Sequence, residues 1–352
     1  MTEIKSPTIN INDFLNELNE SFIIDVRSPG EFLKGHIPGA VNIPLFDDNE
    51  RAEIGIIYKF SGKENAVTRG LELVSPKLSQ LVNETRKISQ NKKIIVHCWR
   101  GGMRSQSFSW LMNTSGLNAR VLEGGYKSYR NCVLKFFETK LNLKILGGPT
   151  GSGKSAILKQ LANSGEQVVD LERLAHHKGS AFGSINEQSQ NPQQLFEHEL
   201  FNAFRTLDLK KPIWLEDEAM AIGWNKIPYP LWKQMKIAPI FKINVPFEER
   251  VKRLVSDYKT TNHELLDRAL SAIKEKLGGQ NYLLATECLR NEDLAGVASI
   301  TLKYYDKAYE FNHEKRELKN IYQISTLTGD EIQNCQKVWM FVRNFNSTST
   351  SL

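Results

Sequence analysis

Short apolar, β-branched runs alternate with longer helical patterns along most of the chain. Helical spacing of apolar residues occurs at 9–18, 71–88, 105–112, 129–141 and 156–162. Runs with the length and composition of buried strands occur at 22–26, 93–96, 120–122, 143–146, 167–169, 212–215 and 240–245. Because strands that alternate with helices usually lie parallel, the pattern predicts an α/β protein with mainly parallel sheets. From residue 247 onward the pattern is helical.

A single cysteine stands where one of these strands ends and a helix begins. Cys98 follows the strand at 93–96, and a glycine pair separates it from the helix at 105–112. Loop N–H groups and a helix N-terminus converge at such a point, and their partial positive charge favours a thiolate. The sequence therefore predicts a reactive thiol rather than the buried, inert cysteine that is the alternative. The predicted anion-binding residues around it are Arg27, Arg100, Gly101, Gly102, Arg104 and Ser105.

A second anion site is predicted where the strand at 143–146 meets the helix at 156–162. The intervening loop matches the pattern Gly-x-x-x-x-Gly-Lys-Ser, with a strand before it and a helix after it. Its backbone N–H groups and the helix N-terminus would form a nest for phosphate, with Lys154 reaching a terminal phosphate and Ser155 available for Mg²⁺. The predicted phosphate-binding residues are Gly148, Gly151, Ser152, Gly153, Lys154 and Ser155.

Carboxylates end two further strands of this second half. Asp170 follows the strand at 167–169, and Glu216 and Glu218 follow the strand at 212–215. Acids at these positions could hold Mg²⁺ or orient a substrate, although many strands end in acids for solubility alone. They are candidate ligands, and the sequence assigns no metal to them.

Length and composition indicate a folded chain of two domains. The chain has 352 residues, of which 40% are hydrophobic and 24% are charged. No apolar run approaches the ~20 residues of a membrane span, and the first residues lack a secretory pattern, so we expect a cytoplasmic protein without a membrane partner. The four cysteines show neither paired spacing nor Cys-x-x-Cys, which argues against a disulfide framework or a zinc site.

Positive charge is concentrated in two stretches. The formal net charge is +6. Residues 123–154 contain six Lys or Arg against two Glu, and residues 231–278 contain ten against six acidic residues. Tyrosines follow at intervals from residue 258 to residue 309. A basic surface with aromatic residues suits RNA loops, whereas the alternatives are a solvated helix face and tyrosines that pack helices together.

Three separated motifs of the first half resemble the rhodanese family. They are Asp25-Val-Arg27 with Glu31-Phe, then residues 35–44 (Gly-His-Ile-Pro-Gly-Ala-Val-Asn-Ile-Pro), then the Cys98 loop closed by Arg104. The resemblance implies that Cys98 carries sulfur or selenium as a persulfide or selenylsulfide. Residues 45–92, between the second and third motifs, contain a polar insertion and a helical stretch without evident chemistry.

From about residue 11 to residue 312 the chain resembles the bacterial tRNA 2-selenouridine synthase family. The match includes residues 98–105, 123–127, 170–172, 174–183, 216–218 and 304–309. The resemblance implies replacement of the 2-sulfur of wobble 2-thiouridine (U34) in tRNA by selenium from selenophosphate, after geranylation of that sulfur with geranyl diphosphate. It implies no tightly bound cofactor, with tRNA and a selenophosphate-supplying enzyme as partners.

Two other interpretations remain at this stage. A cysteine followed after five residues by arginine is also the loop of Cdc25-like phosphatases. A rhodanese-type sulfurtransferase or such a phosphatase domain could equally be fused to an ATP-dependent kinase. The domains we predict are a rhodanese-like domain (1–125), a linker helix (126–142), a P-loop domain (143–246) and a helical, basic C-terminal region (247–352) that contacts tRNA.

Overall fold

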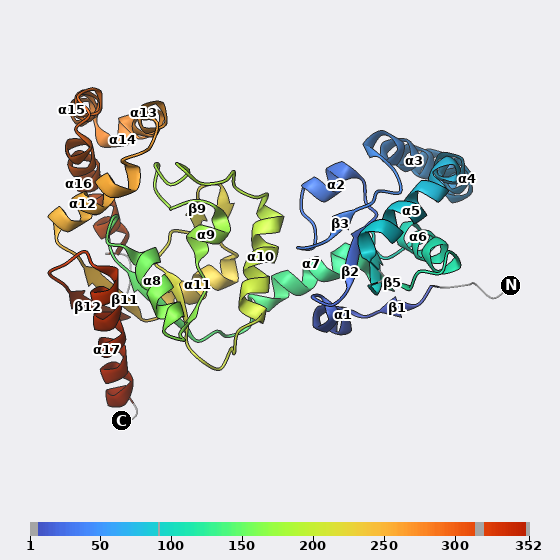
Figure 1. Ribbon diagram of the computed structural model, residues 1–352, viewed down its shortest axis with the longest axis horizontal. Helices are drawn as coiled ribbons and strands as arrows, with labels where there is room; N and C mark the ends of the chain where they lie inside the picture. Colours follow the sequence, from blue (N-terminus) through green and yellow to red (C-terminus); the bar gives the residue numbers. More distant parts are fainter. Residues whose placement is uncertain (1–5, 91, 314–319, 350–352) are drawn as a thin grey trace. The chain divides into compact units, whose positions relative to one another are not determined.

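The protein is described by a computed structural model that places residues 6–90, 92–313 and 320–349 (Figure 1). The chain forms two compact units. The first contains residues 1–136 and 192–198, and the second contains residues 137–191 and 199–352. Both units are α/β, with helices connecting the strands of parallel sheets, so the predicted fold class is confirmed. In the described part of the chain, no helix is both long and apolar enough to cross a membrane.

The first unit contains a five-stranded parallel sheet in the order β1-β5-β4-β2-β3. The strands are β1 (Thr8–Ile9), β2 (Phe22–Asp25), β3 (Val41–Asn42), β4 (Ile94–His97) and β5 (Ala119–Leu122). The helices are α1 (Ile11–Glu17), α2 (Pro29–Leu33), α3 (Asp48–Phe60), α4 (Gly62–Val74), the 3-10 turn η1 (Ser75–Lys77), α5 (Leu78–Ser89), α6 (Met103–Thr114) and α7 (Gly125–Phe136). Strand β4, which precedes the cysteine, lies in the centre and is buried along its whole length.

Local sequence fixes the helices around this central strand. Helix α6 buries Phe108 and Met112 against the sheet, each contributing roughly 2 kcal/mol of apolar transfer free energy. Helix α3 begins with a capping box in which Asp47 and Glu50 accept each other's backbone N–H groups. Yet α3 has no fully buried residue, and it packs mainly beside α4, as Figure 1 also shows.

The second unit contains another five-stranded parallel sheet, in the order β12-β11-β6-β8-β7. The strands are β6 (Leu143–Gly147), β7 (Gln167–Val168), β8 (Ile213–Glu216), β11 (Ile240–Asn244) and β12 (Ile321–Ser325), with a small antiparallel pair β9 (Ala221–Ile222) and β10 (Asn225–Lys226). The helices are α8 (Lys154–Asn163), α9 (Leu171–Ala175), α11 (Tyr229–Ile237), α12 (Phe247–Tyr258), α13 (His263–Ala272), α14 (Lys274–Leu277), α15 (Gly279–Arg290), α16 (Leu294–His313) and α17 (Glu331–Ser349). Helix α10 (Gln193–Arg205) is divided, with residues 193–198 in the first unit and residues 199–205 in the second.

The structure groups the chain differently from the predicted domains. Helix α7, expected to be a linker, belongs to the first unit and buries Tyr126 and Tyr129 there. The region after residue 247 is not entirely helical, because β12 pairs in parallel with β11 at the edge of the second sheet. That strand was missed because Ile-Tyr-Gln-Ile-Ser is short and lies between two long helical patterns.

Candidate active site: a cysteine loop and a phosphate loop

Cys98 lies immediately after β4, in the loop that leads into α6. Its side chain is buried, with 4% of the residue exposed. The Sγ atom lies 3.2 Å from Oγ of Ser105, whose hydroxyl donates to the carbonyl oxygen of Gly102 at 3.0 Å. The structure therefore places two predicted site residues, Cys98 and Ser105, in direct contact.

The loop exposes a set of backbone donors. Within the described residues, the amides of residues 99 to 102 donate to no acceptor. Gly101 has φ +67°, and a Cβ there would lie 2.6 Å from the carbonyl oxygen of Leu122, so only glycine fits. The carbonyls point away, because Cys98 and Trp99 accept N–H groups from Tyr126 and Lys127. Unpaired N–H groups on a curled loop are the arrangement that binds an anion.

The three predicted arginines occupy different environments. Arg100 is exposed and has no charged partner among the described residues. Arg104 donates to Glu31 at 2.8 Å. Burial of Glu31 would raise its pKa, but the hydrogen bond and charge of Arg104 dominate and the pKa is lowered. Arg100 is thus available to an anionic ligand, whereas Arg104 must share its charge with Glu31.

Arg27 lies beneath the loop. Its guanidinium is 1% exposed, donates to both carboxylate oxygens of Asp25 and to the carbonyl of Gly35, and stacks 3.9 Å from the ring centre of Tyr126. Because Nε and Nη2 bond inside the unit and the side chain is buried, we propose that Arg27 positions the loop instead of binding the anion directly. Next to it, burial lowers the pKa of His97, which keeps that imidazole neutral.

The second predicted site is a phosphate loop between β6 and α8. Gly151 and Gly153 both have left-handed backbone conformations, with φ +79° and +77°. Lys154 curls back so that its ammonium donates to the carbonyl of Gly148 at 3.1 Å. The structure brings together all six residues predicted for this loop, Gly148, Gly151, Ser152, Gly153, Lys154 and Ser155, around the N-terminus of α8.

Residues to which the sequence analysis gave no role at the phosphate loop complete it. The Ser155 hydroxyl donates to Glu172 at 2.7 Å, and the Gly148 amide donates to the Tyr309 hydroxyl at 2.8 Å. Arg250 donates to the carbonyl of Thr150 and forms an ion pair with Asp306 at 2.7 Å. No local pattern predicts such contacts, because Tyr309 and Arg250 come from helices about 100 to 160 residues further along the chain.

The predicted acids surround the phosphate loop but make separate contacts. Asp170 caps α9 by accepting the amide of Arg173, and Glu216 accepts the amide of Leu171. Glu218 lies against Gly179. In the described part of the chain, no three His, Cys, Asp or Glu side chains are arranged as a metal site. If Mg²⁺ binds here, the phosphate itself would have to supply ligands beside Ser155.

Glu218 has an unusual protonation equilibrium. Burial and the nearby charge of Glu172 raise its pKa to about 8, against the opposing charge of Lys154. Burial likewise raises the pKa of Glu216, together with the charges of Asp170 and Glu172. The Glu218 carboxyl, which retains its proton near neutral pH, repels a phosphate less than an ionised carboxylate would.

We expect replacement of Glu218 by glutamine to make stability less dependent on pH. Because its folded pKa lies above the ordinary value of 4.5, the folded state holds the proton more tightly. The contribution of Glu218 to the free energy of unfolding is therefore complete below about pH 4.5 and is lost as the pH rises to about 8, by at most ~1.4 kcal/mol per pH unit. Urea unfolding at pH 5, 6.5 and 8 should show a shallower decrease in Glu218→Gln than in the parent, and Glu275→Gln, at an exposed position, should match the parent. Equal slopes in all three proteins would contradict the pKa assignment.

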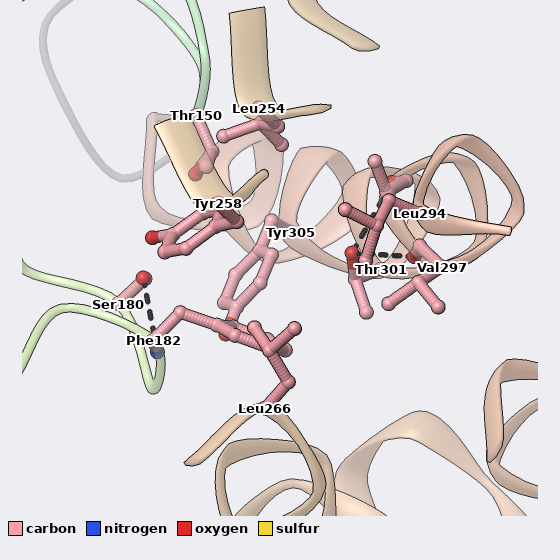
Figure 2. A pocket seen from close by; sticks show the side chains of 11 residues that line it. Thr150, Ser180, Phe182, Leu254, Tyr258, Leu266, Leu294, Val297, Thr301 and Tyr305 are labelled. Atoms are coloured by element: carbon pink, nitrogen blue, oxygen red, sulfur yellow. Dashed lines mark hydrogen bonds between the residues drawn. The ribbon is translucent and has the colours of Figure 1, made fainter. Parts of the chain in front are cut away.

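A small pocket lies beside the phosphate loop (Figure 2). Thr150 and Leu254 line one end, and the rings of Tyr258 and Tyr305 lie over Phe182. Burial raises the pKa of Tyr305 to about 12, so its hydroxyl stays protonated. The pocket volume is only about 40 Å³, enough for one or two waters and too small for a nucleotide base or a prenyl chain.

Fold and site together define a rhodanese-type cysteine domain joined to a phosphate-loop domain. A family model for the rhodanese-like domain matches residues 10–132, and one for the tRNA 2-selenouridine synthase AAA domain matches residues 141–337. Two relatives named tRNA 2-selenouridine synthase, from Serratia proteamaculans and Nitrosomonas europaea, are each 33% identical. The alignments cover 86% and 82% of this chain and 89% and 85% of those proteins. The chain belongs to the tRNA 2-selenouridine synthase family, as the resemblance predicted.

Further similarities extend the comparison. A third relative of the same name, from a Sulfurovum species, is 31% identical over 93% of this chain and 96% of its own length. A solved structure, the N-terminal domain of a proposed ATP/GTP-binding protein from Clostridium difficile 630, is 43% identical. The alignment covers 36% of this chain and 98% of the chain in that structure, with a TM-score of 0.35.

Proposed function

We propose that this protein is a transferase that converts 2-thiouridine at the wobble position of tRNA to 2-selenouridine, with selenophosphate as the selenium donor. The observation that carries the proposal is the buried Cys98 in a loop of unpaired amides, in a chain that also contains a phosphate loop. The first site supplies a sulfur nucleophile, and the second supplies a nest for a phosphate or diphosphate group. Family membership supports the same reaction.

The first chemical step in this proposal is alkylation of the thiouridine sulfur by geranyl diphosphate. The sulfur attacks the first carbon of the geranyl group, and the bond to the diphosphate oxygen breaks. Diphosphate leaves with growing negative charge, which Lys154 and the amides of the phosphate loop would stabilise. This role needs no hydrolysis of ATP, although it leaves room for Mg²⁺ on Ser155.

The second step is exchange of the geranylated sulfur for selenium. Alkylation turns the sulfur into a leaving group, so selenide can add at C2 of the base while the C2–S bond breaks and geranylthiol departs. Cys98 would release that selenide: its thiolate attacks the phosphorus of selenophosphate, an S–P bond forms and the P–Se bond breaks, and water then cleaves the S–P bond to give phosphate. Arg100 and the amides of residues 99 to 102 would hold the phosphate part of selenophosphate. Arg104 would also attract the phosphate, although its ion pair with Glu31 partly neutralises its charge.

The proposed macromolecular partner is tRNA, through its anticodon loop. Basic residues of α7 and of the helices after β11 provide positive charge for a phosphate backbone. The sequence left two roles for the tyrosines of this region, contact with RNA or packing between helices. Tyr258 and Tyr305 have the packing role, because both lie against the apolar core of the unit. We further infer a cytoplasmic location and an enzyme that supplies selenophosphate, as the reaction requires both tRNA and a labile selenium donor.

Reconstitution with purified components tests the proposal. The protein is incubated with a 2-thiouridine-containing tRNA, geranyl diphosphate and selenophosphate, and the nucleosides are separated after digestion. We expect 2-selenouridine only when all the components are present, and S-geranyl-2-thiouridine when selenophosphate is omitted. Magnesium-dependent ATP turnover with no modified nucleoside would instead favour a kinase fused to a rhodanese or phosphatase domain.

A further inference from the structure

A large apolar groove occupies the first unit beside the cysteine loop. It has a volume of about 960 Å³ and is walled by α3, α4 and α6. Its apolar lining includes Phe46, Ile54, Val67, Leu71 and Phe108. This volume lies at the upper end of the range for small-molecule sites, and it exceeds the pocket beside the phosphate loop by more than an order of magnitude.

The groove leaves large apolar side chains in contact with solvent. Leu71 is 65% exposed, Tyr58 57%, Met103 54% and Trp110 49%, although all four line the same concavity. Single exposed apolar residues are common on soluble proteins, but a cluster around one hollow marks a binding surface. Because α3 has no fully buried residue, this helix contributes little to the core of the unit and mainly forms the groove wall.

One side of the groove carries positive charge. Arg51, Arg100 and Arg104 line it, whereas no acidic residue does. Glu31 offsets part of this charge through Arg104 at 2.8 Å and Arg51 at 3.7 Å, but Arg100 has no acidic partner among the described residues. An apolar hollow with arginines along one wall fits an amphiphile that combines a hydrocarbon chain with an anionic group.

The groove also adjoins the reactive cysteine. Arg100, Met103 and Arg104, which follow Cys98 in the loop and the first turn of α6, are lining residues. Phe46 and Phe108 connect the groove to the cysteine, since both line the groove and both belong to the buried apolar cluster that contains Cys98. A ligand in the groove would therefore lie next to the loop in which selenium is delivered.

We propose that this groove binds the prenyl chain during the exchange reaction. The inference rests on the proposed function, which supplies one molecule with the required chemistry: the S-geranylated uridine of tRNA. In it, a short branched hydrocarbon is joined to an anionic phosphate backbone. The chain lies against Ile54, Val67 and Leu71, and the anionic part faces Arg100.

Binding measurements on groove variants test the inference. Leu71→Gln removes apolar contact at an exposed position, and Val67→Trp fills the groove. Phe60→Gln is the matched control, because Phe60 is 75% exposed on α3 but does not line the groove. Circular-dichroism melts identify any variant that fails to fold. The ligands are geranyl diphosphate and an anticodon-loop RNA that carries either S-geranyl-2-thiouridine or 2-thiouridine.

We expect Leu71→Gln and Val67→Trp to weaken binding of geranylated RNA by about tenfold, while binding of 2-thiouridine RNA changes less than about twofold. Loss restricted to geranylated RNA is the expected result, because geranyl diphosphate is proposed to bind at the phosphate loop. Unchanged affinity for geranylated RNA in both variants overturns the inference, and an equal loss of affinity for geranyl diphosphate overturns the assignment of the groove to the tRNA intermediate. Because binding is measured without turnover, absence of selenouridine formation by the parent protein would count against the proposed function and not against the groove.

Discussion

Replacing Cys98 with serine is expected to abolish formation of 2-selenouridine from S-geranyl-2-thiouridine, with a loss on the order of 10³-fold or more. A hydroxyl is a far weaker nucleophile than a thiolate, so it would release selenide from selenophosphate far more slowly. Serine nearly preserves the volume of cysteine and can still approach Ser105, which lies 3.2 Å from the sulfur, so the fold should persist. The rate of the selenium step, measured with pre-geranylated tRNA, reports the effect.

The other cysteines provide controls for this variant. Cys132 lies on α7 in the same unit, is half-buried, and has a pKa raised by burial, so its thiol is a poor nucleophile. Cys132→Ser should keep the parent rate, and Cys288 and Cys335 should be equally dispensable. Selenation at the parent rate by Cys98→Ser would refute the assignment of Cys98 as the nucleophile of the selenium step.

Replacing Lys154 with alanine is expected to slow geranylation about a hundredfold. The ammonium already lies in the phosphate loop, 3.1 Å from the carbonyl of Gly148, and would shift to the diphosphate as negative charge develops there. Loss of one charge-assisted contact to a developing anion costs ~3 kcal/mol, which corresponds to the predicted factor. Lys159→Ala, at an exposed position on the same helix, should behave like the parent.

The two half-reactions distinguish two arrangements of the active site. If selenophosphate is held at the cysteine loop, Lys154→Ala should retain most of the selenium step when pre-geranylated tRNA is supplied, and Cys98→Ser should retain geranylation. Equal loss of both steps in either variant would indicate one shared site. Geranylation at the parent rate by Lys154→Ala would remove the diphosphate role and make ATP the better candidate for the phosphate loop.

Much of this architecture follows from local sequence. The cysteine loop and the phosphate loop each lie between a buried strand and a helix, so their short motifs predict their positions well. The residues that complete them are distant in the chain. Tyr126 under the first loop and Tyr309 at the second become partners only through the tertiary fold, and sequence spacing does not reveal such contacts.

The groove illustrates a second limit of sequence reasoning. Residues 45–92 were predicted to be a polar insertion and a helix without evident chemistry. The structure forms α3, α4 and α5 there, and Ile54, Val67 and Leu71 meet in one hollow only after α3 and α4 pack together. Similarly, Arg27 was predicted to bind an anion, but its burial and its ion pair with Asp25 become evident only once β2 lies beside β4.

The central claim is that the protein makes 2-selenouridine in tRNA, and the most direct measurement is mass spectrometry of tRNA nucleosides from cells. Three strains grown with selenium are compared: one with the gene, one without it, and one that expresses only Cys98→Ser. We predict 2-selenouridine in the first strain alone, 2-thiouridine in the second, and S-geranyl-2-thiouridine accumulating in the third. An unchanged amount of 2-selenouridine in the strain that lacks the gene would contradict the account.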